Sequence, residues 1–448
     1  MFYRNALIDL RNWAKKETRK PLVLRGARQV GKTTLVDEFA KEFDVYLKLN
    51  LEKENDRAIF EQNLDTNNLL TAIYLLRNQP KNDGRTLIFI DEIQNSPKAV
   101  EQLRYFYEEA PHIYVIAAGS LLESLVNHKK KKIEFPVGRV EYLPIRPCSF
   151  NEFLGAIGET QLQQAHFEAR IPEVLHGKVM GLFNTYTLIG GMPEAVNEFS
   201  KKQDIVALQS IYESLLTGYR DDVEKYAEDN QILQNLLRHI LQSGWGYAAQ
   251  RITFERFGNS GYRSREMGEA FRTLEKTMLM ELVYPTTSTM IPIIGEKSRS
   301  PKLLWLDTGL VNYSVGLQNE LFGMKDISSA WRGLVAEHIV GQELLTAEKR
   351  FSYKRSFWVR DAAGSSAEVD YVIQLSDKVI PIEVKSGNNA KLKSLHQFME
   401  KAPHRTAIRF WTNPVSVDIV TTPTGKEFTL HNLPFYYASK IANLVKVE

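Results

Sequence analysis

Residues 26–33 read Gly-Ala-Arg-Gln-Val-Gly-Lys-Thr and lie between an apolar segment and a helix-forming one. In a loop of this kind, successive backbone N–H groups at a helix N-terminus point at bound phosphates. Gly26 and Gly31 provide the backbone freedom for the turn. Lys32 neutralises the β- and γ-phosphates, and the hydroxyl of Thr33 ligates Mg²⁺. The pattern therefore predicts ATP and Mg²⁺ as ligands, with a binding set of Gly26, Ala27, Arg28, Gln29, Val30, Gly31, Lys32, Thr33 and Thr34.

An acidic pair ends a second apolar segment, LIFIDE (87–92). Asp91 is expected at the carboxyl end of a buried strand, where it would hold the magnesium through water as a Walker-B aspartate does. Glu92, directly after it, is placed to polarise the attacking water, which favours hydrolysis over nucleotide binding alone. Two acids at a strand end are by themselves often only solvated, so this prediction depends on the phosphate-binding loop.

Ser120 and Arg139 join Lys32 and Glu92 in the predicted catalytic set. Ser120 follows a third apolar segment, at the position of a polar sensor near the γ-phosphate. Its alternative role is to cap the helix that begins after it. Arg139 is a candidate to stabilise the transition-state charge from a neighbouring domain or subunit. The alternative for Arg139 is an ordinary surface arginine.

Asp370, Glu383 and Lys385 have the spacing of a PD-(D/E)xK nuclease centre, with an acid on one strand and acid-x-lysine on the next. The two-residue period of a strand places Glu383 and Lys385 on one face, where the carboxylate binds a metal and the lysine helps to activate water. Glu337 on the preceding helix and Gln397 on the following one match the companions of such a centre. The alternative is an ion pair on a solvated face, and the residue before Asp370 is not the proline of the namesake motif.

A local basic patch is the candidate nucleic-acid surface. Residues 251–265 carry four arginines against one acid, Glu255. The following helix leaves Arg263 and Arg265 free near its start, as in a winged helix whose recognition helix offers its first residues to the major groove. The prediction is DNA contact through Arg263 and Arg265, and the alternative is a winged helix that packs against the rest of the protein. The Lys129–Lys132 run is a weaker candidate.

The elements that must position the nucleotide-binding residues alternate between strand-like and helix-like segments over residues 1–140. This alternation is typical of an α/β domain with a parallel sheet. The expected elements are strands at 21–27, 45–50, 86–91 and 113–120, and helices at 32–42 and 98–109.

The pattern changes after this region. Residues 150–227 are helical, with a break at Gly190-Gly191-Met192-Pro193, and 283–294 predict a hairpin after two or three short helices. The remaining expected elements are a helix near 329–348, three strands of an antiparallel meander at 353–360, 368–375 and 379–385, and a helix at 391–401.

The composition indicates a soluble globular protein of several domains, since 448 residues exceed one ordinary core, with 43% of them hydrophobic and 25% charged. The net charge of +3 is too small to indicate a nucleic-acid partner by itself. A single cysteine, Cys148, fits a reducing cytoplasm. No apolar run approaches the length of a membrane span, and the N-terminus lacks the apolar core of a signal peptide. We therefore expect a cytoplasmic protein with no membrane partner.

The chain resembles one family of prokaryotic AAA-type ATPases that carry a C-terminal region largely of unknown function. The resemblance rests on GARQVGKTTL, FIDEIQ, AAGS, GRVEYLPIRPCSFNEFL and GGMPEAV, and in the C-terminal half on LLWLDTGL, RGLVAEHIVGQELL, AEVDYVI and PIEVKSG. It spans nearly the whole chain. The P-loop and Walker-B motifs are specific, whereas the connecting motifs are suggestive only in combination.

The resemblance implies an α/β fold with an additional-strand P-loop core, a helical lid, a winged helix and a restriction-endonuclease-like domain. The expected domains are a P-loop AAA-type ATPase core at 1–145, a helical lid at 146–227, a winged helix at 228–304 and a PD-(D/E)xK nuclease-like domain at 305–448. AAA-type proteins often form rings, and the sequence specifies no subunit interface.

Three functions compete. The first is an ATP-hydrolysing enzyme that uses nucleotide state to move its winged-helix and nuclease-like domains on DNA, which the Asp91-Glu92 pair favours. The second is an ATP-gated, metal-dependent nuclease, kept open by Asp370, Glu383 and Lys385. The third is a non-catalytic regulator that ATP locks in one state. We take the first as the prediction.

Overall fold

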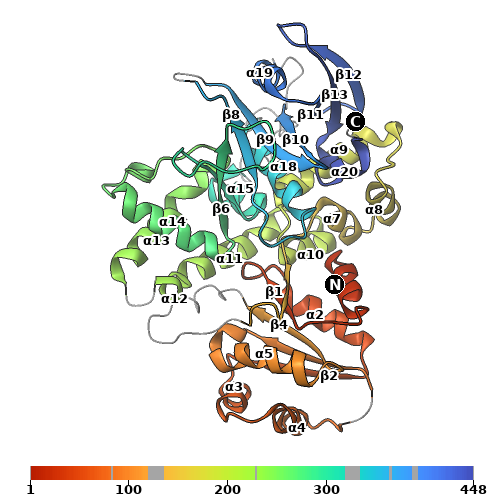
Figure 1. Cartoon of the computed structure of the whole chain (residues 1–448), viewed down its shortest axis with the longest axis vertical. Helices are drawn as coiled ribbons and strands as arrows, with labels where there is room; N and C mark the ends of the chain where they lie inside the picture. Colours follow the sequence, from red (N-terminus) through yellow and green to blue (C-terminus); the bar gives the residue numbers. More distant parts are fainter. Residues whose placement is uncertain are drawn as a thin grey trace.

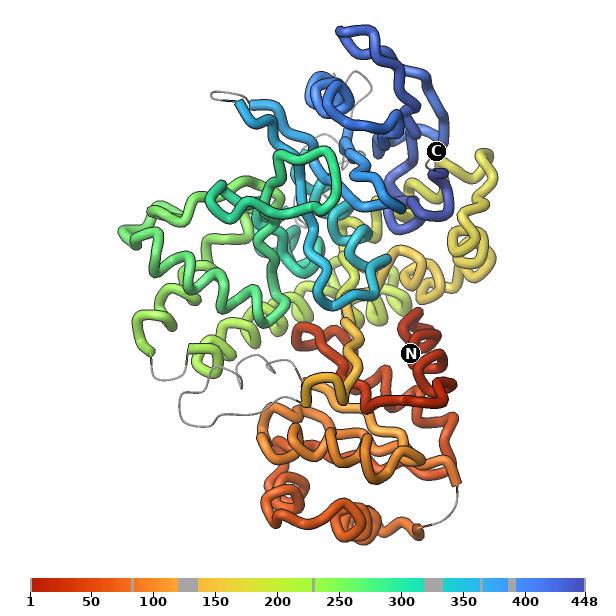
Figure 2. The backbone as a smooth tube through the Cα atoms, in the orientation of Figure 1, coloured from red at the N-terminus to blue at the C-terminus, as the bar shows by residue number. Residues whose placement is uncertain are grey.

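The structure is a computed structural model that describes residues 2–81, 84–119, 136–227, 230–317, 333–362, 366–385 and 392–446. Ser120 and Lys129–Lys132 therefore lie outside the described residues. The chain forms two lobes, of which the first, coloured red to orange, holds the N-terminal sheet (Figure 1). The tube in Figure 2 shows the rest of the chain gathered into a larger second lobe.

The first lobe is built on a five-stranded, wholly parallel sheet. Its strand order is β2-β3-β4-β1-β5, so that β4 lies between β1, which leads into the P-loop, and β3, which ends at Asp91. The four predicted strands are confirmed, and β5 is an addition that the sequence pattern did not predict. The strands are β1 (Leu22–Arg25), β2 (Val45–Asn50), β3 (Thr86–Asp91), β4 (Tyr114–Gly119) and β5 (Glu141–Pro144).

Helices cover both faces of this sheet because every residue of β3 is buried and successive side chains point to opposite faces. Ile88 and Ile90 pack in the cluster that includes α3 (Glu54–Glu61), α4 (Thr66–Leu76) and α5 (Pro97–Glu109). Leu87 and Phe89 pack on the other side, in the cluster that includes α1 (Ala6–Ala14) and α2 (Lys32–Phe39). The two-layer burial holds the carboxyl ends of β1 and β3 rigidly at one edge.

The second lobe begins with a helical region, residues 146–227, which is called the lid below after the role predicted for it. Its helices are α7 (Phe150–Ala156), α8 (Thr160–Phe167), α9 (His176–Ile189), α10 (Pro193–Lys202), α11 (Gln209–Asp221) and α12 (Val223–Ala227). The predicted break lies between α9 and α10. There Gly190 has φ +69°, and a Cβ on Gly191 would stand 2.2 Å from the carbonyl oxygen of Cys148. Glycine at both positions allows the lid backbone to approach its neighbours this closely.

Two helices and two strands follow: α13 (Gln231–Ser243), α14 (Ser264–Lys276), β6 (Met280–Thr286) and β7 (Lys302–Trp305). The predicted hairpin within 283–294 is wrong. Only the first residues of that segment belong to a strand, and β6 finds its antiparallel partner in β7. Pro292 offers no backbone N–H for a ladder, and the residues after β6 form a long loop instead.

The C-terminal strands extend β6 and β7 into one eight-stranded sheet of order β12-β13-β11-β10-β9-β8-β6-β7. The predicted meander is confirmed, because β9 pairs antiparallel with both β8 and β10. The remaining elements are α15 (Thr308–Ser314), α18 (Leu334–Thr346), β8 (Ser356–Val359), β9 (Glu368–Leu375), β10 (Lys378–Val384), α19 (Lys393–Lys401), β11 (Thr406–Trp411), β12 (Ser416–Thr421), β13 (Glu427–Pro434) and α20 (Ile441–Leu444).

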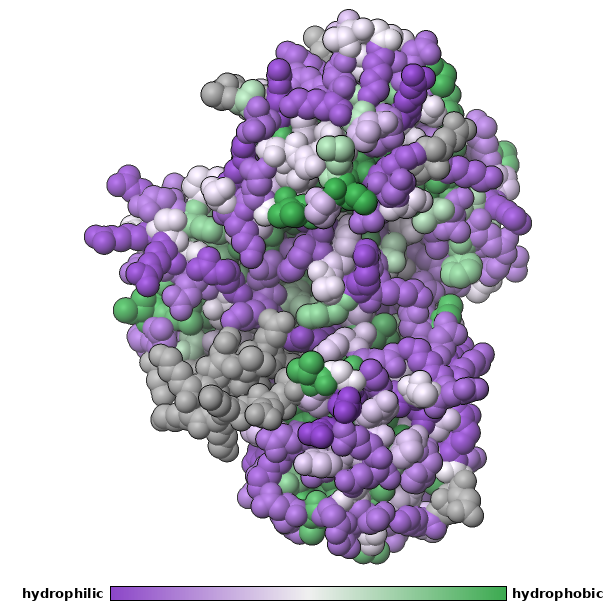
Figure 3. Space-filling model, viewed as in Figure 1, coloured by the Kyte–Doolittle hydropathy of each residue, from purple (hydrophilic) through white to green (hydrophobic). Residues whose placement is uncertain are grey.

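One continuous apolar core joins the lid, the α13–α14 region and the eight-stranded sheet. Its members include Phe183 of α9, Phe271 of α14 and Tyr371 of β9. Because these three regions share one core, we expect them to move together relative to the first lobe. Hydrophilic residues cover most of the face seen in Figure 3. In the described part of the chain, no helix combines the length and apolarity that a bilayer span requires.

Candidate functional site

The P-loop runs from the end of β1 into α2 and has the backbone geometry of a phosphate cradle. Gln29 and Gly31 have φ of +64° and +87°, and these left-handed residues give the sharp turn that a phosphate-binding loop makes before its helix. Lys32 is buried, and its Nζ donates to the carbonyl oxygens of Gly26 and Ala27 at 2.9 and 2.8 Å. The predicted loop residues thus enclose the ammonium that would meet the phosphates.

Burial is the main influence on this ammonium, and it lowers the pKa of Lys32 to about 8. The nearby carboxylates of Glu92 and Asp91 act in the opposite direction but more weakly. Burial destabilises the charged ammonium. A phosphate bound beside it would stabilise this charge, so the site favours an anionic ligand.

Thr33 and Asp91 meet across the site, as the sequence predicts. The hydroxyl of Thr33 donates to Oδ2 of Asp91 at 2.8 Å, and burial raises the pKa of Asp91. A hydroxyl and a carboxylate are hard oxygen donors of the kind that Mg²⁺ takes. The donor set therefore fits a magnesium ion held by Thr33 and Asp91.

Glu92 is held in the left-handed region, with φ +53° and ψ +45°. A non-glycine residue costs energy there and persists only where its surroundings fix it, often at active sites. Gln94 supplies one constraint, because its side-chain amide donates to Oε2 of Glu92. Sequence reasoning missed Gln94, although the FIDEIQ segment that contains it carried part of the resemblance.

A cavity of about 330 Å³ borders the start of α2. Phe2 and Arg4 line it from the N-terminal segment, Gly31 and Thr34 from the P-loop region, and Pro193 from α10 of the lid. Its volume lies in the range of small-ligand pockets. The cavity thus opens where the P-loop, the N-terminal segment and the lid meet.

Arg28, the third residue of the P-loop, is bound to the lid. Its Nη1 donates to both carboxylate oxygens of Asp222, which follows α11 and is 3% exposed. The hydroxyl of Tyr219 donates to the backbone oxygen of Arg28 at 3.1 Å. Both interactions fasten the phosphate cradle to the second lobe. The sequence contained no signal for this pair, because Asp221 and Asp222 are adjacent acids and nothing in the sequence indicates which of them is buried.

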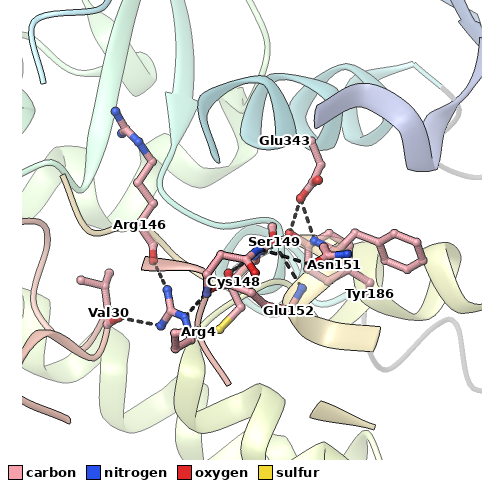
Figure 4. A network of polar contacts seen from close by, with 11 residues as sticks. Arg4, Val30, Arg146, Cys148, Ser149, Asn151, Glu152, Tyr186 and Glu343 are labelled. Carbon is pink, nitrogen blue, oxygen red and sulfur yellow. Dashed lines mark hydrogen bonds and ion pairs between the residues drawn. The ribbon is translucent and has the colours of Figure 1, made fainter. Parts of the chain in front are cut away.

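A second set of contacts joins the P-loop to the second lobe through Arg4. The guanidinium of this mostly buried residue donates to the carbonyl oxygens of Val30 and Arg146 at 3.2 and 2.8 Å, and to Oε1 of Glu152 at 2.9 Å; its side chain is 12% exposed. Figure 4 shows Arg4 at the centre of these contacts. Glu152 belongs to the capping box of α7, so this arginine ties the P-loop backbone to the first helix of the lid.

The same network reaches α18. Oε1 of Glu343 accepts from the backbone N–H of Phe150 at 3.0 Å and from the hydroxyl of Tyr186 at 2.8 Å (Figure 4). Tyr186 also donates to the carbonyl oxygen of Cys148 at 2.8 Å. Cys148 is thus a buried structural residue beside the lid.

Two predicted catalytic residues are not joined to this site. Ser120 lies outside the described residues. Arg139 precedes β5, at the amino end of the sheet and opposite the P-loop edge, and pairs with Glu108 of α5 at 2.7 Å. Its guanidinium is directed away from the nucleotide site of its own chain, so a catalytic role would require a neighbouring subunit.

The nuclease-like residues cluster in the second lobe around a cation that the sequence did not predict. Nζ of Lys302, on β7, lies 2.6 Å from carboxylate oxygens of both Glu337 and Glu368 and is 2% exposed. Burial would lower the pKa of Lys302, but these carboxylates, with Asp370, outweigh burial and raise it. A lysine from the region before the nuclease-like motif therefore neutralises part of its acidic cluster.

The other half of the cluster contains a buried oxygen without a partner. Oε1 of Glu383 pairs with Lys385 at 2.6 Å, while Oε2 is buried and meets no hydrogen-bond donor in the described part of the chain. Asp370 accepts from the backbone N–H of Val384 at 2.7 Å. Burial, followed by the charge of Asp370, raises the pKa of Glu383 to about 8.

These side chains do not form a metal site as they stand. Among the described residues, no three Asp, Glu, His or Cys side chains are placed to share one ion. Gln397, on α19, accepts from Arg360 at 3.4 Å and forms no hydrogen bond with Asp370 or Glu383 in the described part of the structure. The structure thus brings Glu337, Asp370, Glu383 and Lys385 together without the geometry of a metal centre.

The basic patch is partly engaged. Arg263 immediately precedes the first residue of α14 and Arg265 lies in its first turn, and both are exposed. Arg251 instead pairs with Glu368 at 3.7 Å and lies over the ring of Phe357. Arg263 and Arg265 therefore remain as the candidate DNA contacts.

Comparison with protein families gives three matches along the chain. Residues 18–154 match an AAA domain. Residues 180–321 match a domain of unknown function (DUF8612), and residues 332–435 match a second domain of unknown function (DUF4143). The comparison with curated protein sequences gives no match.

Several solved structures are similar at low identity. The Walker-type ATPase PABY2304 of Pyrococcus abyssi is 13% identical, with a TM-score of 0.45 over 70% of this chain and 96% of that one. The Aeropyrum pernix Orc1 protein in complex with DNA is 13% identical, with a TM-score of 0.28 over 71% and 93%. Drosophila ORC bound to DNA is 18% identical, with a TM-score of 0.25 over 60% and 66%.

These low scores add nothing to the assignment, which rests on the family match and on the P-loop geometry. Residues 18–154 thus resemble an AAA domain and contain the P-loop geometry described above, and the two stretches after them resemble domains of unknown function.

Proposed function

We propose that this protein is a Mg²⁺-dependent ATPase that transmits the state of its nucleotide from the P-loop to the second lobe. The observation that carries the proposal is the pairing of Arg28, inside the P-loop, with the buried Asp222 beside the lid helices. A phosphate that enters the cradle competes with Asp222 for the same guanidinium. Nucleotide binding and lid position are therefore linked through one side chain.

The residues divide the chemistry as follows. The P-loop N–H groups and Lys32 bind the phosphates, and Thr33 with Asp91 would hold a magnesium ion that neutralises developing charge. Glu92, constrained by its backbone and by Gln94, orients the attacking water. The cavity lined by Phe2, Pro193 and Thr34 has the size and position to take the base.

The coupling is tested with Asp222→Asn, which keeps the shape of the side chain but removes its charge. We expect the variant to bind a non-hydrolysable ATP analogue, whereas the wild-type change in hydrogen exchange of α11 on binding should be abolished. The neighbouring Asp221→Asn is the matched control, because Asp221 is exposed. An Asp222→Asn protein whose α11 still responds fully to nucleotide would refute this route of coupling.

We further propose that the second lobe acts on DNA through a winged helix formed by the α13–β7 region. The exposed start of α14, with Arg263 and Arg265, supports this role. The double variant Arg263→Ala/Arg265→Ala should bind duplex DNA more weakly. The slope of log K against log salt should become shallower by roughly 0.9 for each DNA phosphate that the variant no longer neutralises. Filter binding at several salt concentrations measures both effects.

The matched control is Arg104→Ala, since Arg104 is exposed on α5 and pairs with Glu108 in the other lobe. Wild-type protein without duplex affinity at low salt would leave α14 with a packing role only. That outcome would favour the third function, a regulator that ATP locks in one state.

The second candidate function is an ATP-gated nuclease. The order α18, β8, β9, β10, α19, β11 supports the nuclease-like fold, and Glu383 has a buried oxygen without a donor in the described part of the chain. The ammonium of Lys302 opposes the activity, because it already pairs with two of the acids. We therefore propose that this domain has a nuclease-like fold but does not cleave nucleic acid.

Glu383→Gln tests the environment of this carboxyl through the pH dependence of the protein's stability. The raised pKa of Glu383, about 8 against an ordinary 4.5, means that the folded state disfavours the charged form. The wild type then loses stability as the pH rises from about 4.5 toward 8. The variant should be more stable than the wild type at pH 8, by about 1 kcal/mol or more, and no more stable at pH 4.

Thermal melting over this pH range measures the difference, with the exposed Glu427→Gln on β13 as the control. Incubation of the wild type with linear, circular and single-stranded DNA and with RNA, in ATP with Mg²⁺ or Mn²⁺, should give no cutting. Metal-dependent cleavage that disappears in Glu383→Gln would instead establish the ATP-gated nuclease.

A further inference from the structure

A cavity of about 350 Å³ lies where the first lobe, the α13–α14 region and the C-terminal sheet meet, away from both sites described above. Its lining comes from residues 145–147 after β5, from 272–281 at the end of α14 and the start of β6, from 304–306 around β7, and from 342–355 around the end of α18. Segments that are far apart in sequence thus form one enclosure.

Arg146 places an unpaired cation in this cavity. Its backbone oxygen accepts from Arg4, but Nε of its guanidinium is buried and meets no acceptor in the described part of the chain. Figure 4 shows this guanidinium extended away from the polar network. Burial, with a smaller contribution from Arg355, lowers the pKa of Arg146 to about 10. The charges of Glu281 and Glu348 act on Arg146 in the opposite direction, but these carboxylates pair with Arg355 and Arg350 and neither forms an ion pair with Arg146 among the described residues. A partly buried charge that lacks a direct partner is costly, so Arg146 can gain from a bound anion.

The other charges of the cavity leave an excess of cations. Arg355 forms an ion pair with Glu281, with 2.8 Å between Nη2 and Oε2, and Lys354 pairs with Glu275 at 3.1 Å. Arg272 and Lys276 are exposed on one face of α14 at the cavity, and neither pairs with a carboxylate among the described residues. Together with Arg146, they provide three cations for an incoming anion.

The remaining wall of the cavity is apolar. Met278, Met280 and Trp305 line the cavity with apolar surface. Methionine and aromatic side chains of this kind accommodate flat apolar groups. The cavity therefore combines an anion subsite with an apolar subsite in a volume typical of small-ligand pockets.

We propose that this cavity binds a small organic phosphate, with the phosphate on Arg146, Arg272 and Lys276 and the apolar part against Met280 and Trp305. Three cations favour a phosphate dianion over a single carboxylate. The enclosure by three parts of the chain and the apolar wall fit a small molecule rather than a nucleic-acid backbone. The backbone of Arg146 is bonded to Arg4, which also holds Val30 of the P-loop, so the cavity adjoins the framework of the ATP site.

The test uses 4-bromophenyl phosphate as the probe, with the full-length protein and with the P-loop filled by Mg²⁺ and a non-hydrolysable ATP analogue. Calorimetry should show saturable binding of one probe per chain. Arg146→Met should weaken it about 10- to 100-fold, the range for charge-assisted hydrogen bonds. Arg170→Met, an exposed arginine outside the cavity, should leave it unchanged. The phosphate-free 4-bromophenol should not bind.

A crystal soaked with the probe should show the anomalous signal of bromine inside the cavity, beside Met280 and Trp305. Absence of saturable binding, equal affinity in Arg146→Met, or bromine located elsewhere would each overturn the proposal. If duplex DNA displaces the probe, and this competition is lost in Arg146→Met, the cations of the cavity bind nucleic acid and the proposal is wrong.

Stability gives an independent readout. With the P-loop filled, Arg146→Met should melt at a higher temperature than the wild type in buffer without phosphate, because an unpaired buried charge has been removed. Inorganic phosphate should raise the melting temperature of the wild type and close this gap. If Arg146→Met does not fold, the exposed Lys276→Met decides, since it should weaken probe binding severalfold. Unchanged probe affinity in Lys276→Met would then count against the site.

Discussion

Glu92→Gln is expected to bind ATP as the wild type does and to hydrolyse it about 10²- to 10⁴-fold more slowly, the usual contribution of a residue that positions or deprotonates the attacking group. The structure strengthens this expectation. Glu92 is strained into the left-handed region and held by Gln94 directly after Asp91, so its carboxylate has a defined position at the carboxyl edge of the sheet. Glutamine preserves the shape and the contact but cannot act as a base.

Phosphate release measures hydrolysis and nucleotide affinity measures binding. Both are determined on the same preparation of Glu92→Gln, so that a loss of hydrolysis is distinguished from a loss of binding. Glu101→Gln, an exposed acid on α5, is the control and should retain wild-type turnover. Asp91→Asn should also reduce turnover, because it removes the magnesium ligand. If Asp91→Asn is inactive while Glu92→Gln hydrolyses ATP normally, another residue orients the water and the assignment of Glu92 is wrong.

Lys32→Ala is expected to abolish turnover and to weaken ATP binding by about 2–5 kcal/mol, the cost of truncating one partner of a buried, hydrogen-bonded charge pair. This corresponds to roughly 30-fold to several-thousand-fold in affinity. Nζ lies within 2.9 Å of two P-loop carbonyl oxygens, so the loop already holds the ammonium beside the phosphate cradle. Unchanged turnover in Lys32→Ala would refute the P-loop assignment.

The low pKa of Lys32 adds a pH dependence. The pKa of about 8 in the empty site means that the ammonium is deprotonated as the pH rises through 8. Because ATP binds the protonated form, wild-type affinity should fall between about pH 7.5 and 9, and binding in this range should take up a proton. Lys32→Ala should lack this dependence. Lys41→Ala, an exposed lysine that pairs with Glu38, should retain it together with full affinity.

The candidate nucleotide site could be proposed from the sequence because its residues lie in two short segments. Gly26 to Thr33 are continuous in sequence and Asp91 ends one apolar strand, so spacing and hydropathy sufficed to predict where they lie. The buried strands were predicted for the same reason, since a parallel sheet covered on both faces requires continuous apolar runs. The hairpin prediction failed because residues with β-forming tendency after β6 had no strand partner of their own.

The contacts between lobes could not be predicted. Arg28 and Asp222 are 194 residues apart, and Lys302 reaches Glu337 from a strand outside the nuclease-like motif. Each of these side chains has a sequence neighbourhood that would suit an exposed charge equally well. Their burial depends on which segments pack against them, and that depends on the whole chain.

The sequence by itself determined the P-loop pattern, the acidic end of β3 and the succession of an α/β sheet, a helical region and a C-terminal meander. Each of these depends on the type and spacing of residues within a short segment, which backbone geometry converts directly into structure. Only the tertiary structure decided that β6 and β7 extend the C-terminal sheet, that Lys302 pairs with Glu337 and Glu368, and that Arg28 pairs with Asp222. The physical reason is that the energy of a buried charge depends on its partners in space, and these come from segments that the fold alone brings together.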